Sequence, residues 1–399
     1  MNLPWQISTL TLLFFSVLQP GICVADAGPS GVPTGNVTVC QRATKISQIV
    51  GEYDRERKEP TLNRTFSRFG LAGTDLGVPF RHKERTYFVF GDTYGVRGGD
   101  PIAYSTDNNP EDGLQLHFIQ DCAGIYKPVT IDEITQGAYE VPMEGMSVNG
   151  KMYVYHTTDR SWKTEMGRSI VAVSEDDGRT FDYLYDLSNN HFINVSIVRT
   201  EPGQWKGLPP VKEPGLIMFG TGAFRKSNVR LAFQPAANIE SPETIRYFVG
   251  LDPAGRPRWS PRETDAIPLF NQPCIGELSV SYNRFIKKWI MLYNCFNEGK
   301  TILMRTADRP WGPWSEPQII FDPEEDAGFC RFMHLSWKEK KCDALHEPGK
   351  QNESGLAYGP YQLEEAATGN DSSTTIYFTL STWNPYTVVL MKATICTTP

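Results

Sequence analysis

The amino-acid sequence predicts an all-β fold, a five-bladed β-propeller closed by pairing of its N- and C-terminal segments. Five similar apolar heptapeptides recur along the chain, and a second strand-like run follows each of them. Short, nearly continuous apolar runs are typical of strands that are buried on both faces. Gly and Pro are plentiful, at 34 and 29 residues, and helical periodicity is scarce, which favours many short strands joined by turns.

The repeat divides the chain into five units of about four strands each. The heptapeptides, each expected to be the second strand of its unit, start at Tyr87, Met152, Leu216, Trp289 and Ile376. The fifth unit lacks an outer strand because the chain ends, and we expect the segment near Lys45–Tyr53 to supply it. The repeat core covers about 69–395 within a single domain, 28–399. A pair of β-sandwiches or a β-helix is the alternative.

The N-terminus, residues 1–27, predicts a signal peptide. Ser8–Leu18 is an apolar stretch too short to span a membrane, and Ala25–Ala27 fits a cleavage site. We therefore expect a secreted, extracellular glycoprotein without a membrane anchor, and a monomer. Sequons for N-glycosylation begin at Asn36, Asn63, Asn194, Asn352 and Asn370.

Cleavage after Ala27 would leave seven of the eight cysteines. None of them has the spacing of a metal site, so disulfides are expected in this compartment. A hairpin with Tyr282 opposite Lys287 would set Cys274 opposite Cys295. The other expected pairs are Cys330–Cys342 and Cys40–Cys396, which leave Cys122 as the odd cysteine.

Two Asp residues are the best candidates for chemistry. The four residues between Arg81 and Thr86 predict a hairpin loop, and the same register sets Asp75 opposite Asp92. Like charges that face each other across a hairpin are destabilising. A chain that holds two such carboxylates face to face therefore indicates acid–base or nucleophilic chemistry. The alternative is that each Asp caps a turn.

Other polar residues are expected at the same rim of the propeller. Glu144, which the Asn149–Gly150 turn sets opposite Tyr155, and Glu277 are candidate supporting acids, although each alone also fits a structural carboxylate. No cofactor is predicted, but one His with carboxylates and waters would suffice for a structural Ca²⁺ in the channel. Candidate substrate-binding residues, for which surface solvation or core packing is the alternative, are Arg225, Asn228, Trp383, Asn384 and Tyr386.

Four stretches of the chain carry a resemblance to a known family: the hairpin with GTDLG and FGDT, Gly276–Val280, Pro310–Pro317 and Ser381–Tyr386. They resemble the secreted family catalogued as domain of unknown function 4185, over roughly Phe69 to Ile395. The resemblance implies a five-bladed propeller akin to arabinanase and levansucrase folds. Some bacterial members are endo-D-arabinanases of glycoside hydrolase family 183, whose paired catalytic Asp residues map onto Asp75 and Asp92.

These observations favour a secreted glycoside hydrolase that acts on a polysaccharide, for instance an arabinan-like glycan. One of Asp75 and Asp92 would be the acid, and the other the base or nucleophile. The alternative is a non-catalytic secreted glycan-binding propeller, and a protein-interaction scaffold is a third. The formal charge of −7, without a Lys/Arg-rich run, argues against nucleic acid as a partner.

Overall fold

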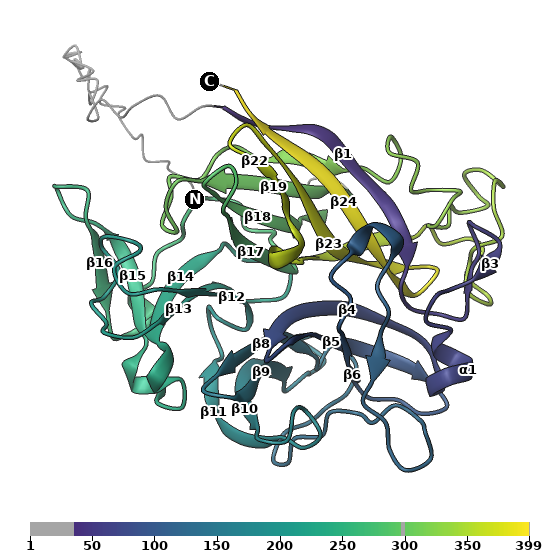
Figure 1. Cartoon of the computed structure of the whole chain (residues 1–399), viewed down its shortest axis with the longest axis horizontal. Coiled ribbons are helices and arrows are strands. Elements are labelled where there is room, and N and C mark those ends of the chain that lie inside the picture. Colours follow the sequence, from purple (N-terminus) through teal and green to yellow (C-terminus); the bar gives the residue numbers. More distant parts are fainter. Residues whose placement is uncertain (1–35, 297–299, 399) are drawn as a thin grey trace, which may run out of the picture. The chain divides into compact units, whose positions relative to one another are not determined.

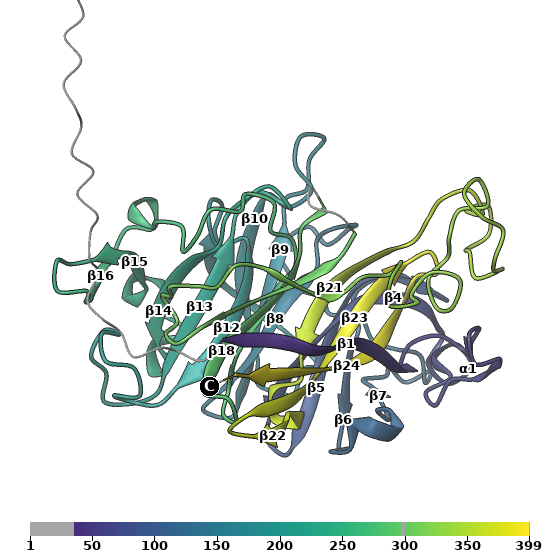
Figure 2. The ribbon, with the colours of Figure 1, turned by 90° about the horizontal axis from the view of Figure 1, so that it is seen from above.

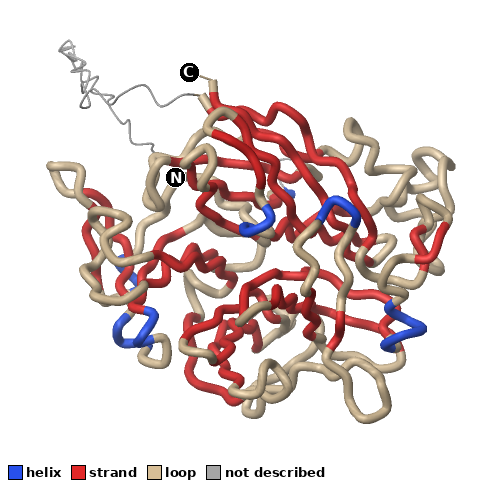
Figure 3. The backbone as a smooth tube through the Cα atoms, viewed as in Figure 1, coloured by secondary structure: helices blue, strands red, loops and turns tan. Residues whose placement is uncertain are grey.

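The computed structural model describes residues 36–296 and 300–398, which form a five-bladed β-propeller (Figures 1 and 3). The predicted signal peptide, residues 1–27, lies outside the described residues. Among the residues that are described, no helix has the length and apolar character needed to cross a membrane.

Each of the first four blades is an antiparallel sheet whose strands follow one another along the chain. Blade 1 holds β4 (Leu71–His82), β5 (Arg85–Gly95), β6 (Ile102–Ser105) and β7 (His117–Phe118). Blade 2 holds β8 (Pro142–Val148), β9 (Lys151–Thr158), β10 (Arg168–Ser174) and β11 (Asp182–Ser188). Blade 3 has a fifth strand and holds β12 (Asn194–Thr200), β13 (Gly215–Thr221), β14 (Arg230–Pro235), β15 (Arg246–Leu251) and β16 (Pro257–Ser260). Blade 4 holds β17 (Leu278–Asn283), β18 (Lys288–Asn294), β19 (Ile302–Ala307) and β20 (Gln318–Phe321).

The fifth blade combines segments from both ends of the described chain. It holds β21 (Leu356–Gln362), β22 (Thr368–Asn370), β23 (Ser373–Trp383), β24 (Thr387–Thr397) and β1 (Val37–Gln48). β1 lies antiparallel along β24, from Val37 opposite Thr397 to Gln48 opposite Val389. This pairing begins before the predicted segment 45–53 and ends within it, because the chain leaves the sheet near Gly51, whose φ is 102°.

The connection from β1 to blade 1 holds β2 (Tyr53–Asp54), β3 (Glu59–Pro60) and α1 (Thr65–Phe69). Single 3₁₀ turns occur within blades, such as Pro110–Asp112 between β6 and β7 and Glu364–Ala366 between β21 and β22. In Figure 2 the yellow-green loop between β20 and β21 rises above the sheets, whereas β22 lies below them. The two faces of the propeller therefore carry different connections.

The predicted heptapeptides lie in the second strands, β5, β9, β13, β18 and β23. Their central residues are fully buried, as at Phe88, Val154 and Phe219. Five apolar clusters hold the molecule together, and each one is built mainly from side chains of two neighbouring blades. These runs are apolar because a neighbouring blade covers each face of the strand, as the sequence predicts.

The innermost strands, β4, β8, β12, β17 and β21, surround the central channel. Polar side chains join neighbouring inner strands across the blades. Ser196 Oγ accepts the Val280 N–H at 3.0 Å, and Ser279 Oγ accepts the Gln362 N–H at 3.2 Å. All five strands are the first of their blade, so their first residues share one mouth of the channel and their last residues share the other.

Two predicted registers are wrong. In blade 1, Arg81 does pair with Thr86, but the turn is shorter because His82 pairs with Arg85. A bulge at Leu76–Gly77, with φ of 62° and 72°, then shifts the ladder by one residue, so Asp75 lies opposite Gly91 and not Asp92.

In blade 4 the closing pair is Asn283 with Lys288, in place of the predicted Tyr282 with Lys287. In blade 2 the predicted pairing of Glu144 with Tyr155 is confirmed. A bulge there sets Pro142 opposite His156.

The three predicted disulfides are confirmed: Cys40–Cys396, Cys274–Cys295 and Cys330–Cys342, with Cα–Cα distances of 5.8, 5.1 and 5.5 Å. Cys122 is the exposed free cysteine. The pair Cys274–Cys295 forms despite the register error because Cys274 lies in the loop before β17, where the ladder no longer constrains it.

Two of the predicted glycosylation sites are buried. Asn63 is inaccessible, and its Nδ2 donates to the carbonyl oxygens of Ile49 and Leu114, both at 2.9 Å. Asn194 is 3 % exposed and donates to the Gly276 carbonyl at 3.1 Å. Burial of these two amides in the folded chain does not favour glycans there, whereas Asn36, Asn352 and Asn370 are exposed.

Candidate active site

Asp75 lies in β4, close to the mouth where the inner strands begin, and is 7 % exposed. Its Oδ2 accepts a hydrogen bond from the Tyr358 hydroxyl at 2.8 Å. Among the described residues, Oδ1 has no hydrogen-bond partner. Burial raises the pKa of Asp75 well above its usual range, and the charge of Asp92 raises it further. Asp75 is therefore suited to carry a proton on Oδ1.

Asp92 lies in β5, is half-buried, and accepts the backbone N–H of Tyr139 at 3.0 and 3.2 Å with its two carboxylate oxygens. Burial raises the pKa of Asp92 to about 6, and the charge of Asp100 acts in the same direction. The Tyr139 N–H and the charge of Arg160 oppose this rise. At neutral pH Asp92 is therefore mostly ionised.

The register shift does not separate the two carboxyl groups, because the charge of Asp92 still raises the pKa of Asp75. In a regular strand, successive side chains face opposite sides. Asp92 has a φ of 35°, which breaks this alternation next to Gly91. The result is a pair of carboxyl groups with unequal proton affinities at one mouth of the channel.

A third buried carboxyl group, Asp100, belongs to the same cluster and escaped the sequence analysis. It is 6 % exposed, lies 3.7 Å from His156 Nε2, and accepts the backbone N–H of Asp92. Burial raises the pKa of Asp100. The available signal was the stretch Gly98–Pro101, which directly follows the β4–β5 hairpin and returns the chain to the same rim.

Glu277 and Arg225 form a buried ion pair beside the two Asp residues. Arg225 Nη2 lies 2.6 Å from Glu277 Oε1, Arg225 Nε donates to Oε2 at 3.1 Å, and Asn294 Nδ2 also donates to Oε2, at 2.9 Å. Burial would raise the pKa of Glu277, but the charge and hydrogen bonds of these partners lower it below its ordinary value. Glu277 therefore stays ionised, which does not fit the predicted role of a supporting acid.

Arg225 connects this ion pair to Asp75. Its guanidinium lies 4.4 Å from the ring centre of Phe224, 4.5 Å from that of Phe296 and 5.3 Å from that of Tyr358. Burial raises the pKa of Tyr358 well above its usual range, so its hydroxyl remains a donor to Asp75. Arg225, predicted to bind substrate, thus has its main partner within the protein.

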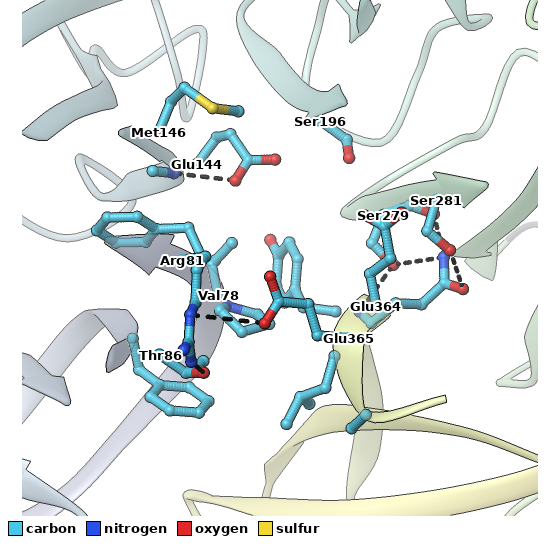
Figure 4. Close-up of a pocket in the computed structure, with 18 of the residues that line it drawn as sticks. Val78, Arg81, Thr86, Glu144, Met146, Ser196, Ser279, Ser281, Glu364 and Glu365 are labelled. Carbon is cyan, nitrogen blue, oxygen red and sulfur yellow. Dashed lines mark hydrogen bonds and ion pairs between the residues drawn. The ribbon is translucent and has the colours of Figure 1, made fainter. Parts of the chain in front are cut away.

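Glu144 lies deeper in the channel than the Asp pair. It accepts the N–H groups of Gly145 and Ile197, both at 2.9 Å, and burial raises its pKa to about 8. It lines a cavity of about 500 Å³ together with Arg81 and Ser196. Figure 4 shows these three side chains around the cavity. The later residues of the inner strands line this cavity, which places it toward the mouth opposite Asp75. The structure thus separates Glu144 from the predicted site.

The remaining predicted binding residues have different surroundings. Asn384 is fully buried, donates to the Lys350 carbonyl at 3.0 Å and accepts the Glu347 N–H at 2.8 Å, so it holds the long β20–β21 loop and cannot bind substrate. Asn228 Oδ1 accepts the Gln272 N–H at 2.6 Å, which is also a structural contact.

The aromatic side chains on either side of Asn384 are more accessible. Trp383 is half-buried, and Lys350 Nζ lies 4.4 Å from its ring centre. Tyr386 lies 5.9 Å from the ring of Tyr94, and its hydroxyl lowers the pKa of Asp75. Tyr386 therefore belongs to the Asp75 cluster.

Comparison with known proteins gives one family and several similar folds. The family model described as domain of unknown function (DUF4185) matches residues 61–392. No curated protein matches the chain. A presumed hydrolase from Bacteroides ovatus has a similar structure, with a TM-score of 0.53 at 11 % identity over 82 % of this chain and 87 % of that one.

Two further solved structures are less similar. An exo-β-1,3-galactanase from Phanerochaete chrysosporium has a TM-score of 0.45 at 9 % identity, over 88 % of this chain and 64 % of that one. An α-L-arabinofuranosidase from Podospora anserina has a TM-score of 0.44 at 9 % identity, over 91 % and 98 % of the two chains.

Proposed function

The chain belongs to the DUF4185 family, and we propose that it is a secreted glycoside hydrolase that cleaves a polysaccharide. One observation carries the proposal: Asp75 and Asp92 have unequal proton affinities at one mouth of the channel, and the charge of Asp92 raises the pKa of Asp75. Glycosidic bonds are commonly cleaved by two such carboxyl groups, one protonated and one ionised.

The surroundings of the two groups assign their roles. Tyr358 holds Asp75 by Oδ2, which leaves Oδ1 to deliver a proton to the glycosidic oxygen. Asp92, held in place by the Tyr139 N–H, is the ionised partner. It either attacks the anomeric carbon or activates a water molecule, according to whether configuration is retained or inverted.

Secretion is supported by the disulfides and by the predicted signal peptide. The three disulfides fit an oxidising compartment. We infer a monomeric extracellular glycoprotein that carries glycans at the exposed sequons Asn36, Asn352 and Asn370. The family resemblance makes an arabinan-like glycan the first substrate to test.

The test is release of reducing ends from arabinans, galactans and fungal wall glycans by the purified secreted chain. We expect one of these polymers to be cleaved, and Asp75→Asn or Asp92→Asn to lower kcat by about 10²- to 10⁴-fold. Asp308→Asn is the matched control, because that side chain is 46 % exposed. Unchanged cleavage by both active-site variants would overturn the assignment, and binding without cleavage by the wild type would favour the glycan-binding alternative.

A further inference from the structure

Trp162 is an exposed tryptophan at the tip of a tight turn. It is 90 % exposed, whereas the other tryptophans of the described residues are buried or half-buried. The turn is closed by two backbone hydrogen bonds, from Ser161 N–H to Thr164 O at 2.9 Å and from Thr164 N–H to Ser161 O at 3.3 Å. An ordered turn thus presents a large apolar ring with a polar N–H to solvent.

The turn belongs to the loop between β9 and β10, on the side of the propeller that carries the Asp pair. β9 begins beside the Asn149–Gly150 turn, where β8 ends. Because β8 starts at the mouth of Asp75, β9 returns to that mouth and delivers the loop 159–167 to the same rim.

A short chain of contacts connects Trp162 to Asp92. Tyr139 donates its backbone N–H to Asp92, and the guanidinium of Arg160 lies 4.9 Å from the ring centre of Tyr139. The Arg160 N–H in turn donates to Glu140 at 2.8 Å. Trp162 follows two residues later, so its Cα lies at most about 7 Å from that of Arg160. The exposed ring is therefore close to the candidate active site without being part of its carboxyl cluster.

We propose that Trp162 is a sugar-stacking platform of an outer subsite, and that a bound glycan chain extends from the two carboxyl groups past Tyr139 and Arg160 to Trp162. This inference rests on the proposed function and adds the length of the substrate to it. Lys163 Nζ lies 4.7 Å from the ring centre of Trp162, on one face. The other face is left for the C–H groups of a sugar ring, while Arg160 and Lys163 supply donors for hydroxyl groups.

In this proposal a chain of several sugars contacts both the Asp pair and Trp162. The substrate class is therefore a polysaccharide or a long oligosaccharide. Removing the platform should weaken binding of long chains and leave short ones unaffected.

The experiment compares Trp162→Ala with the wild type on the polymer that is cleaved and on the shortest oligosaccharide of the same sugar that is cleaved. We expect KM for the polymer to rise about three- to tenfold, from the energy of one aromatic contact, with no change for the short substrate. Trp162→Phe should retain most of the affinity. Leu251→Ala, which removes an exposed apolar side chain in the outer part of blade 3, is the control. Equal effects on both substrates, or none on the polymer, would overturn the inference.

A binding measurement separates this inference from the proposed function. Migration of Asp92→Asn and Asp92→Asn/Trp162→Ala through gels that contain arabinan or galactan reports polymer affinity without cleavage. Retardation that depends on Trp162 would support the platform even if no glycan is hydrolysed. Retardation that is independent of Trp162, or absent for both variants in every gel, would count against it.

Discussion

Replacing Arg225 by Met tests whether the charge of Glu277 depends on Arg225, and the test does not require the protein's function to be known. Arg225 is the cationic partner of Glu277, whose side chain is 4 % exposed. Met keeps much of the side-chain volume but removes the charge and both hydrogen bonds to Glu277. Glu277 would then be a buried carboxylate with the amide of Asn294 as its remaining side-chain donor.

The expected magnitude follows from the burial of the pair. Breaking one half of a buried ion pair costs about 3–5 kcal/mol, because the remaining charge is left without compensation. Since Asn294 still donates to Glu277, we expect a value near the lower end, about 3 kcal/mol at neutral pH. The same change at Arg256, which is 78 % exposed and pairs with Asp252, should cost less than about 1 kcal/mol.

The loss should depend on pH in a defined direction. In the folded wild type the pKa of Glu277 is lowered. The ion pair therefore stabilises the fold above about pH 4.3, the pKa of Glu in the unfolded chain. This stability is lost as the pH falls through the pKa of Glu277 in the folded chain. In Arg225→Met burial without the partner raises the folded pKa. The destabilisation should therefore grow as the pH rises above about 4.3 and should shrink when the carboxyl group binds a proton.

The assay is the free energy of unfolding in urea for wild type, Arg225→Met and Arg225→Met/Glu277→Gln, at about pH 7.5 and about pH 5. We expect the double variant to recover about 2 kcal/mol relative to Arg225→Met at the higher pH, because the uncompensated charge is gone. A loss below about 1 kcal/mol, or an equal loss at both pH values, would refute the description of Glu277 as a buried charge that depends on Arg225.

Three further predictions concern catalysis, the disulfides and glycosylation. The plot of kcat/KM against pH should rise through about pH 6, where Asp92 loses its proton, and should fall at higher pH, where Asp75 loses its proton. A profile that is flat across pH 6 would contradict the role of Asp92. Replacing both Cys40 and Cys396 by Ser should lower the free energy of unfolding by about 2–5 kcal/mol, since their disulfide closes a loop with a sequence separation of 356 residues. If the free energy of unfolding measured in denaturant is unchanged, the bond does not stabilise the fold. Peptide mapping of the secreted chain by mass spectrometry should find glycans at one or more of Asn36, Asn352 and Asn370. It should find none at Asn63 or Asn194, and a glycan at either position would disprove its burial.

The sequence by itself determined the architecture, because the signals for it are local. Apolar heptapeptides repeat five times, and a strand covered by neighbouring blades requires apolar side chains on both faces. The Asn149–Gly150 turn sets the register of its hairpin for the same reason, since two adjacent residues specify the turn. The pairs Cys274–Cys295 and Cys40–Cys396 were also accessible from the sequence, because the expected strand pairing brought their chain segments together.

The tertiary structure alone decided how the site is assembled. The register predicted for Asp75 assumed an unbroken ladder, and the bulge at Leu76–Gly77 depends on backbone conformations that side-chain periodicity does not encode. The hydroxyl that holds Asp75 belongs to Tyr358, 283 residues away, and Arg225 meets Glu277 across 52 residues. Such partners meet only when blades pack around the channel, and burial in that packing is what sets their proton affinities.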